Sequence, residues 1–430
     1  MTTPSVIADD LTGACDVGAE LATAGFIVRV MVDCADQLEA PRDAPGVVRV
    51  LNTQSRGLGT RDAHDRVSRA VRRRPAAVLL KKIDTALRGH LGTELDAALD
   101  GIGARLAFIL PAIPAAGRVT REGCQWFAGL PLASTEFAND PEGAGGESSI
   151  AAVLARESGR RAGVIGRSVV TAGELAERAR TFAREGVAFV VVDAESDADL
   201  ATAVASILAL EPPLCLAGST ALAWALARHL AERGDCSAPG TGIRPGARPC
   251  ATPRGPALIV CGSLHSTARE QIAAVLKAGL AVRVAAPASD ACGGVSAAAL
   301  AARVALGAGR HVVVSAVAPA APPDLAARRA TESTLAELTR EIIAESGPAA
   351  TLVLIGGETS YAVLRRLGTT ELAVRGCFAP LIAVGEILDG TAAGAELVTK
   401  GGSGGGVDTL VALLTSTAAG GTPAAQSVAG

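Results

Sequence analysis

The chain has 430 residues, of which 49% are hydrophobic and only 2% aromatic, and its formal net charge at pH 7 is −3. This length predicts two domains, and the near-neutral charge argues against nucleic acid or an anionic membrane surface as a partner. The sequence shows no signal peptide pattern and no run of the roughly 20 apolar residues that cross a bilayer. Its nine cysteines are dispersed without a CxxC pair, which is typical of reduced thiols. We therefore expect a soluble cytoplasmic protein.

Short aliphatic runs, separated by gaps large enough for a helix, follow one another through residues 1–235. The runs lie at 6–8, 27–32, 47–52, 77–82, 106–112, 187–194 and 213–219. Segments 61–74 and 173–185 lie between such runs and have helical spacing, whereas 138–149 has the composition of a loop. Alternation of this kind predicts an α/β domain with a doubly wound, largely parallel sheet.

The composition changes after residue 235. Residues 236–256 are dense in proline and glycine and have no periodicity, which predicts a linker. A second series of strand-like runs follows at 257–263, 282–287, 311–317, 351–357, 381–387 and 396–402. We predict a second doubly wound α/β domain over 257–418, an active-site cleft between the two domains, and a disordered tail over 419–430.

Two adjacent carboxylates, Asp9 and Asp10, end the first predicted strand in the segment ADDLTGACD (8–16). Ligands of open α/β sheets bind at the carboxyl ends of strands, so this turn is placed where chemistry occurs. A pair of carboxylates can bind hydroxyl groups, accept a proton or hold Mg²⁺. The alternative is that one of them only caps the helix expected from Leu11 onward.

Charged residues also end the third and fourth predicted strands. Arg56 follows the third strand, and the segment KKIDTALRG (81–89) ends the fourth with Lys81, Lys82, Asp84 and Arg88. Together with Asp10 they predict a mixed-charge pocket for a small hydroxylated anion, in which arginine binds a carboxylate and aspartate binds hydroxyls. A solvated cluster of salt bridges is the alternative. The loop 111–118 follows another strand and could close the pocket.

Glycine-rich turns follow three strands of the second domain. They contain Ser263, the segment GGET (356–359) and the segment KGGSGGG (400–406), which precedes a helix predicted over 407–414. Backbone amides of such turns can bind phosphate at a helix N-terminus, so we predict a nucleotide site. Only four of the 40 basic residues are lysine, and three of these, Lys81, Lys82 and Lys400, lie in the predicted site segments. No Walker A motif is present, and no GxGxxG follows the first strand.

The ordered set of motifs resembles the four-carbon acid sugar kinases, a family that includes D-threonate, D-erythronate and 3-oxo-tetronate kinases. The resemblance runs through ADDLTGACD (8–16), KKIDTALRG (81–89), PAIPAAGR (111–118), CGSLHSTAREQI (261–272), GGET (356–359) and LVTKGGSGGG (397–406). It implies ATP-dependent phosphorylation of the C4 hydroxyl of a four-carbon sugar acid, with the acid in the N-terminal domain and ATP in the C-terminal one. The family usually has aspartate at the position of Glu358 and an aromatic residue at that of Gly404.

The resemblance also implies roles for particular residues. It implies that the substrate is bound by Asp10, Arg56 and the stretch 81–84 (Lys81, Lys82, Ile83 and Asp84). It implies that ATP is bound by Ser263, by the stretch 356–359 and by Gly402. From the chemistry of phosphoryl transfer we add substrate contacts from Asp9 and Arg88, and nucleotide contacts from Lys400 and Gly401. Lys400 would neutralise phosphate charge, and Glu358 is a possible ligand of Mg²⁺. Arg88 or Lys82 would bind the substrate carboxylate, and Asp10 or Asp84 would orient and deprotonate the hydroxyl.

Two other functions remain open at this stage. An NAD-dependent sugar-acid dehydrogenase would share the doubly wound fold, but the dinucleotide fingerprint is missing after the first strand. A non-catalytic sensor that binds the acid sugar or the nucleotide would keep the pocket without turnover. The sequence leaves open which four-carbon acid is bound and the oligomeric state. For the kinase we expect hinge closure about the 236–256 linker to exclude water.

Overall fold

The computed structural model describes residues 3–34, 46–74, 76–140, 142–234, 236, 253–287, 294–316, 324–347 and 350–416. The predicted linker therefore lies mostly outside the described residues, and the predicted tail lies wholly outside them. In the described part of the chain, no helix is both long and apolar enough to cross a membrane.

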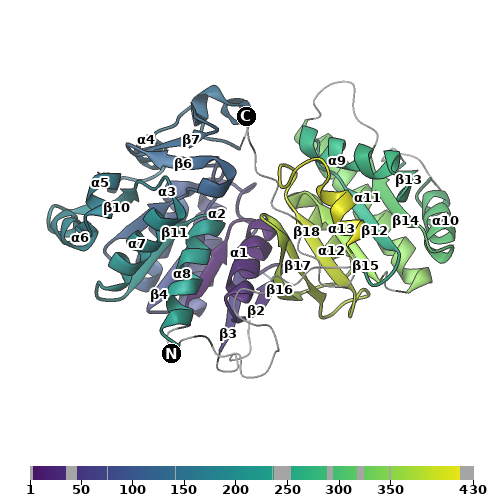
Figure 1. Cartoon of the computed structure of the whole chain (residues 1–430), viewed down its shortest axis with the longest axis horizontal. Coiled ribbons are helices and arrows are strands. Elements are labelled where there is room, and N and C mark those ends of the chain that lie inside the picture. The colour runs from purple at the N-terminus through teal and green to yellow at the C-terminus, as the bar shows by residue number, and fades with distance from the viewer. Residues whose placement is uncertain are drawn as a thin grey trace.

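The N-terminal half is a parallel sheet covered by helices, as the sequence predicted (Figure 1). Its strands are β1 (Ser5–Ala8), β2 (Ile27–Met31), β3 (Val47–Asn52), β4 (Val78–Lys82), β5 (Ala107–Leu110), β9 (Arg161–Ile165), β10 (Val187–Val192) and β11 (Leu214–Gly218). Its α-helices are α1 (Leu11–Thr23), α2 (Thr60–Arg73), α3 (Leu91–Ile102), α4 (Ile150–Ala155), α5 (Arg167–Thr171), α6 (Leu175–Arg184), α7 (Asp197–Leu208) and α8 (Thr220–Glu232). A small antiparallel sheet of β6 (Arg118–Arg121), β7 (Cys124–Phe127) and β8 (Leu130–Pro131) follows β5, and a 3₁₀ helix, Glu136–Asn139, comes after it.

The C-terminal half repeats this architecture with fewer strands. Its parallel strands are β12 (Ala257–Cys261), β13 (Ala281–Ala285), β14 (His311–Ser315), β15 (Thr351–Ile355) and β18 (Glu396–Lys400). Two antiparallel strands, β16 (Glu371–Ala379) and β17 (Ile382–Ile387), extend this sheet beyond β18. Its helices are α9 (Ser266–Lys277), α10 (Gly294–Gly307), α11 (Leu325–Ser346), α12 (Gly357–Arg366) and α13 (Thr409–Thr415). Helix α13 begins two residues later than predicted, because the glycine-rich turn extends through residues 407 and 408.

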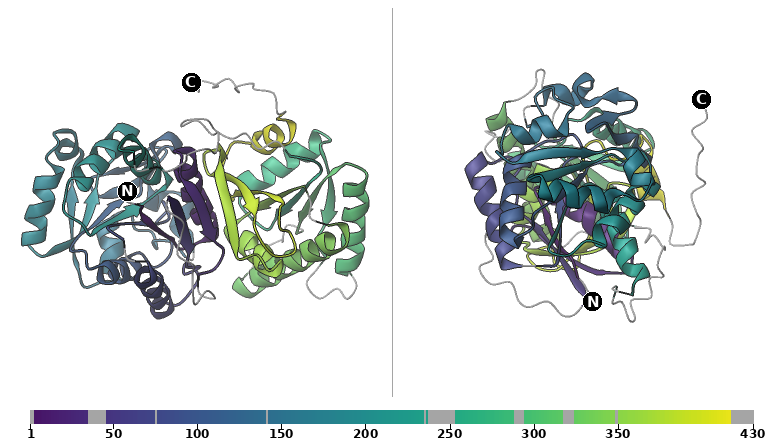
Figure 2. Two further views of the ribbon diagram at one scale, coloured as in Figure 1. Left: turned by 90° about the horizontal axis from the view of Figure 1, so that it is seen from below. Right: turned by 90° about the vertical axis from the view of Figure 1, so that its left-hand side faces the viewer.

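The two halves share one continuous sheet, which the sequence did not predict. Strand β16 pairs antiparallel with β2, and this pairing links all 15 strands of the large sheet. Helix α1 packs over the junction and contacts both β16 and β17. Gly18 permits this approach, since a Cβ there would lie 3.1 Å from Val28 and 3.6 Å from Val374. The left view in Figure 2 agrees with Figure 1 that α1, in purple, lies where the halves meet.

Strand order places a topological switch point in each half. In the N-terminal half β1 lies between β3 and β4, and in the C-terminal half β12 lies between β14 and β15. Crevices that bind ligands form at such points, beyond the carboxyl ends of the strands. The strands themselves are aliphatic and buried, as expected for a parallel sheet covered on both faces. The fold therefore predicts two half-sites, one after β1, β3 and β4 and the other after β12 and β15.

Candidate active site

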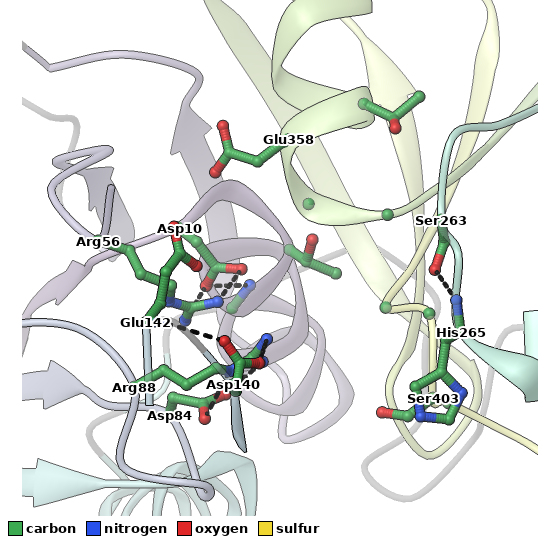
Figure 3. Close-up of a pocket in the computed structure, with 18 of the residues that line it drawn as sticks. Asp10, Arg56, Asp84, Arg88, Asp140, Glu142, Ser263, His265, Glu358 and Ser403 are labelled. Carbon is green, nitrogen blue, oxygen red and sulfur yellow. Dashed lines mark hydrogen bonds and ion pairs between the residues drawn. The ribbon is translucent and has the colours of Figure 1, made fainter. Parts of the chain in front are cut away.

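One cavity of about 610 Å³ is lined by residues of both half-sites. Figure 3 shows Asp10, Arg56, Asp84 and Arg88 on one side of it and Ser263 on the other, with Glu358 reaching toward Asp10. The predicted residues that line it are Asp10, Arg56, Lys82, Asp84, Arg88, Ser263, Gly356, Gly357, Glu358, Thr359, Gly401 and Gly402. Four predicted residues do not line it, namely Asp9, Lys81, Ile83 and Lys400. The structure thus brings most of the predicted site together.

Asp10 caps α1 and also binds a buried arginine. Its Oδ1 accepts a hydrogen bond from the Gly13 amide at 3.1 Å, and the guanidinium of Arg56 donates to both of its carboxylate oxygens, at 2.9 and 3.1 Å. The Nε of Arg56 donates to Asp9 at 2.8 Å. Burial alone would raise the pKa of Asp9, but Arg56 and the nearby lysines outweigh it and lower that pKa. Arg56 therefore favours the charged form of Asp9 and binds both oxygens of Asp10.

Asp84 and Arg88 form a second ion pair in the cavity wall. Two hydrogen bonds, of 2.8 and 3.0 Å, join the Arg88 guanidinium to the Asp84 carboxylate, which also accepts from the Ala86 amide at 2.9 Å. Burial would raise the pKa of Asp84, but the Arg88 guanidinium outweighs it and holds that pKa well below its usual range. Asp140 lies 3.8 Å from Arg88 on the other side. The charges of this pair therefore compensate each other within the protein.

The adjacent lysines of β4 point in different directions because successive side chains alternate along a strand. Lys81 is fully buried and forms an ion pair of 2.6 Å with Glu94 of α3, so it supports the end of the strand. Lys82 lines the cavity and donates to the Ile83 carbonyl at 2.8 Å. A Cβ at Gly13 would lie 3.3 Å from the Lys82 ammonium, which places this charge beside the start of α1.

The glycine turns of the C-terminal half lie directly against this helix start. Gly356 has a φ of 108°, which favours glycine, and it leads into α12. A Cβ at Gly357 would lie 2.9 Å from the Thr12 hydroxyl and 3.1 Å from Asp10. At Gly402 a Cβ would lie 2.2 Å from the Ser263 hydroxyl. The close packing requires glycine at these positions and leaves backbone amides at the N-terminus of α12, where an anion can bind.

Lys400 lies behind its glycine turn. The side chain is fully buried, and its ammonium donates to the carbonyls of Gly401 at 2.7 Å and Gly402 at 3.3 Å. Burial lowers the pKa of Lys400 to about 8. The geometry suits a lysine that fixes the shape of the turn, since its charge is directed at backbone oxygens of the chain itself.

Glu358 reaches across to the N-terminal half. Its carboxylate accepts from the Gln54 amide at 2.9 and 3.1 Å, and Gln54 has a left-handed φ of 46° at the end of β3. Burial, aided by neighbouring carboxylates such as Glu332, raises the pKa of Glu358 to about 7. Among the described residues, no three His, Cys, Asp or Glu side chains converge to hold a metal ion by themselves.

Several cavity residues were not predicted from the sequence. Thr12 and Asp16 both lie on α1. Their spacing of four residues places them on one face of the helix, and this spacing could have been recognised in the sequence. Burial raises the pKa of Asp16 to about 8, and its Oδ1 has no hydrogen-bond partner in the described part of the chain. Other such residues come from the segment around 140 and from α11, including Asp140, Glu142 and Glu332, while Arg118 is the last residue of the loop 111–118 that was expected to close the pocket.

Comparison with protein families gives two matches that divide the chain as the fold does. A model described as a sugar-binding N-terminal domain matches residues 5–226, and one described as a nucleotide-binding C-terminal domain matches residues 258–410. Among solved structures, Haemophilus influenzae protein HI1011 has a TM-score of 0.70 at 20% identity, covering 95% of this chain and 98% of that one. A protein of Salmonella typhimurium LT2 has a TM-score of 0.77 at 21% identity, covering 96% and 98%. At these identities the two structures support the fold alone.

Relatives of known activity match more closely in sequence. The D-threonate kinase of Bordetella bronchiseptica is 33% identical over 94% of this chain and 95% of its own. The 3-oxo-tetronate kinase of Methylobacterium radiotolerans is 30% identical over 94% and 96%. The match to the D-threonate kinase of Salmonella typhimurium is 34% identical and covers 62% of this chain and 59% of that one. Both domain models match in order, and two of these kinases match over nearly their whole length. The chain therefore belongs to the four-carbon acid sugar kinase family.

Proposed function

We propose that this chain transfers the terminal phosphoryl group of ATP to the C4 hydroxyl of a four-carbon sugar acid. The observation that carries the proposal is the shared cavity, because the carboxylates and arginines of the sugar-binding half face the glycine turns of the nucleotide-binding half across it. Phosphoryl transfer needs little covalent chemistry from a protein, so in-line positioning and charge stabilisation are the main requirements. A cavity shared by two half-sites would allow donor and acceptor to be placed in line.

The nucleotide would bind along the start of α12 and the 401–404 turn. Phosphate oxygens would accept from backbone amides there, and the partial positive charge of the helix N-terminus favours an anion. Ser263 and Gly402 pack against each other and would form the floor of the nucleotide site. In this proposal Lys400 acts through the turn, since its ammonium is bonded to the carbonyls of Gly401 and Gly402.

The sugar acid would lie on the N-terminal side, with its C4 hydroxyl at Asp10. We favour Asp10 over Asp84 as the group that orients this hydroxyl. Each of the two carboxylates is bound by an arginine and by one backbone amide, so their positions decide between them. Asp10 lies against Gly357, the first residue of α12, so a hydroxyl bound to it would face the incoming phosphoryl group.

Mg²⁺ would supply neutralisation of phosphate charge when it is bound with ATP. Glu358 is the residue of this chain that we expect to face the cation. The pKa of Glu358 near 7 reflects burial and neighbouring carboxylates, and a cation would compensate this unfavourable charge. Aspartate, usual at this position in the family, and glutamate can both serve as a ligand, although glutamate reaches one methylene further.

The proposal is tested by measuring ADP release from ATP with D-threonate, D-erythronate and 3-oxo-tetronates, each with and without Mg²⁺. We expect turnover with at least one acid and only with Mg²⁺. If the purified chain released no ADP with any of them at millimolar concentrations, the kinase assignment would be wrong. Tight acid binding by calorimetry without ADP release would instead support a non-catalytic sensor. Nicotinamide reduction in the presence of the acids would support a dehydrogenase.

A further inference from the structure

In the described part of the chain, one cavity arginine of the N-terminal half forms no ion pair. Three arginines of that half line the cavity, namely Arg56, Arg88 and Arg118. Arg56 is bound to Asp9 and Asp10, and Arg88 is bound to Asp84. Arg118 has no carboxylate within ion-pair distance among the residues that the structure describes, and its one printed side-chain hydrogen bond goes to the Thr85 hydroxyl. Four of its five N–H groups therefore remain for another acceptor.

Aromatic rings hold this guanidinium in place. Its central carbon lies 4.7 Å from the ring centre of Phe127 and 5.9 Å from that of Phe137, and the two rings pack edge to face at 5.3 Å. The backbone of Arg118 exchanges two hydrogen bonds with Ile113, which fixes the start of β6. A side chain so anchored loses little freedom when it binds a ligand. In a chain with only 2% aromatic residues, two phenylalanines at one arginine make a specialised environment.

The electrostatics of Arg118 also favour an anionic ligand beside it. Burial lowers the pKa of Arg118, and the positive charge of Arg88 acts in the same direction, while Asp84 only partly offsets them. A buried charge is costly unless a partner compensates it. An arginine presents its donors as a planar fork that matches the two oxygens of a carboxylate.

We propose that Arg118, aided by Thr85, binds the carboxylate of the sugar acid and thereby makes this site select acids over neutral polyols. The inference rests on the proposed function and extends it. The side-chain contacts of Arg118 are all within the N-terminal half, whereas Asp10 lies against Gly357 of the nucleotide-binding half. A four-carbon acid would therefore point its C1 carboxylate at Arg118 and its C4 hydroxyl at Asp10. This replaces Arg88 and Lys82 as the candidates for carboxylate binding.

The chain offers a matched control on the same strand. Arg121 is the last residue of β6 and also stacks on an aromatic ring, that of Trp126 at 5.5 Å. It is ion-paired with Glu195 and does not line the cavity. Replacing either arginine by methionine keeps an apolar stem on the ring and removes the charge. The two variants therefore differ mainly in whether the lost charge faced the cavity.

The experiment measures KM for D-threonate and D-erythronate, KM for ATP, and turnover of threitol and erythritol, in the wild type, Arg118→Met and Arg121→Met. Arg118→Met should raise the KM for the acids about 10- to 100-fold, the range expected for losing hydrogen bonds to a charged group. Its KM for ATP and its turnover of the polyols should stay within about threefold of the wild type, a change of under roughly 1 kcal/mol. Arg121→Met should match the wild type throughout. Calorimetry should show the same loss of acid affinity without ATP.

Several results would overturn the assignment. An unchanged KM for the acid in folded Arg118→Met would do so, as would a rise confined to the KM for ATP, which would make Arg118 a phosphate ligand. If Arg118→Met failed to fold, Arg118→Gln, which can still bond to Thr85, must show the loss of acid affinity. A wild type inactive with every acid would refute the kinase function, while acid affinities measured by calorimetry would still decide the role of Arg118.

Discussion

Asp10→Asn is the variant that best separates chemistry from structure in this site. The substitution keeps the shape of the side chain and removes its charge. The amide oxygen can still accept from the Gly13 amide, so the cap of α1 should survive. The interaction with Arg56 changes more, because that guanidinium now donates to both carboxylate oxygens of Asp10.

The expected magnitudes follow from these contacts. Breaking a buried ion pair completely costs about 3–5 kcal/mol. Arg56 keeps its bond to Asp9, and asparagine keeps one acceptor, so we expect a loss of about 1–3 kcal/mol in the free energy of unfolding. If Asp10 accepts the proton of the attacking hydroxyl, turnover should fall roughly 10²-fold or more, as for other general bases. The expected loss of turnover in Asp10→Asn is therefore much larger than its reduced stability could explain.

Asp9→Asn is the control for this interpretation. Asp9 shares the same arginine through a bond of 2.8 Å, yet it does not line the cavity. Its loss should reduce stability to a similar extent, while turnover stays within about fivefold, roughly 1 kcal/mol of barrier. Both variants are assayed by ADP release at saturating ATP and acid, and by thermal unfolding. Near-normal turnover in Asp10→Asn would reduce Asp10 to a helix cap. If both variants lost turnover to the same extent, the loss would result from a changed position of Arg56.

Three further variants test the other half-site and the buried acid. Lys400→Met should raise the KM for ATP about 10-fold and leave acid affinity unchanged, because it removes hydrogen bonds to the turn carbonyls of Gly401 and Gly402 and no direct ligand contact. Steady-state kinetics and calorimetry check this, and weakened acid binding would contradict it. Gly402→Ala should also raise the KM for ATP, since its Cβ would lie 2.2 Å from the Ser263 hydroxyl, whereas Gly406→Ala, with open space around it, should not. Asp16 has a pKa near 8, raised from 3.8 by burial, so its contribution to stability is lost as pH rises from about 4 to 8. Asp16→Asn should remove that part of the pH dependence, and unchanged melting temperatures relative to wild type at both pH 5 and pH 8 would contradict it.

Much of the site could be predicted from the sequence because parallel strands bring their carboxyl ends to one edge. Asp10, Arg56 and Asp84 are far apart in the chain, but each follows a recognisable aliphatic strand. The predicted strand pattern alone therefore placed them together. The same alternation that defines a strand also indicates that Lys81 and Lys82 face opposite sides, so only one of them can reach the ligand. That signal was present in the sequence.

Other features depend on contacts that local patterns do not contain. Strand β16 has a mixed composition, and its pairing with β2 joins segments about 340 residues apart, at Glu371 and Met31. The stacking of Arg118 on Phe137 requires the fold of the segment after β8. Lys400 looked like a phosphate ligand because lysine is scarce, whereas its bonds to turn carbonyls depend on the curvature of the chain after β18.

The continuous sheet changes how closure of the cavity can occur. Rotation of two independent domains about the 236–256 linker would break the β2–β16 pairing and the contacts of α1 with β16 and β17. A sheet can instead twist at this antiparallel junction, which keeps its hydrogen bonds and moves the walls of the cavity by a small angle. Two contacts already bridge the walls, from Gln54 to Glu358 and from His265 to Glu136 at 3.5 Å. Because Glu358 belongs to the proposed nucleotide site, we expect ATP binding to change the position of the sugar-binding wall through this contact.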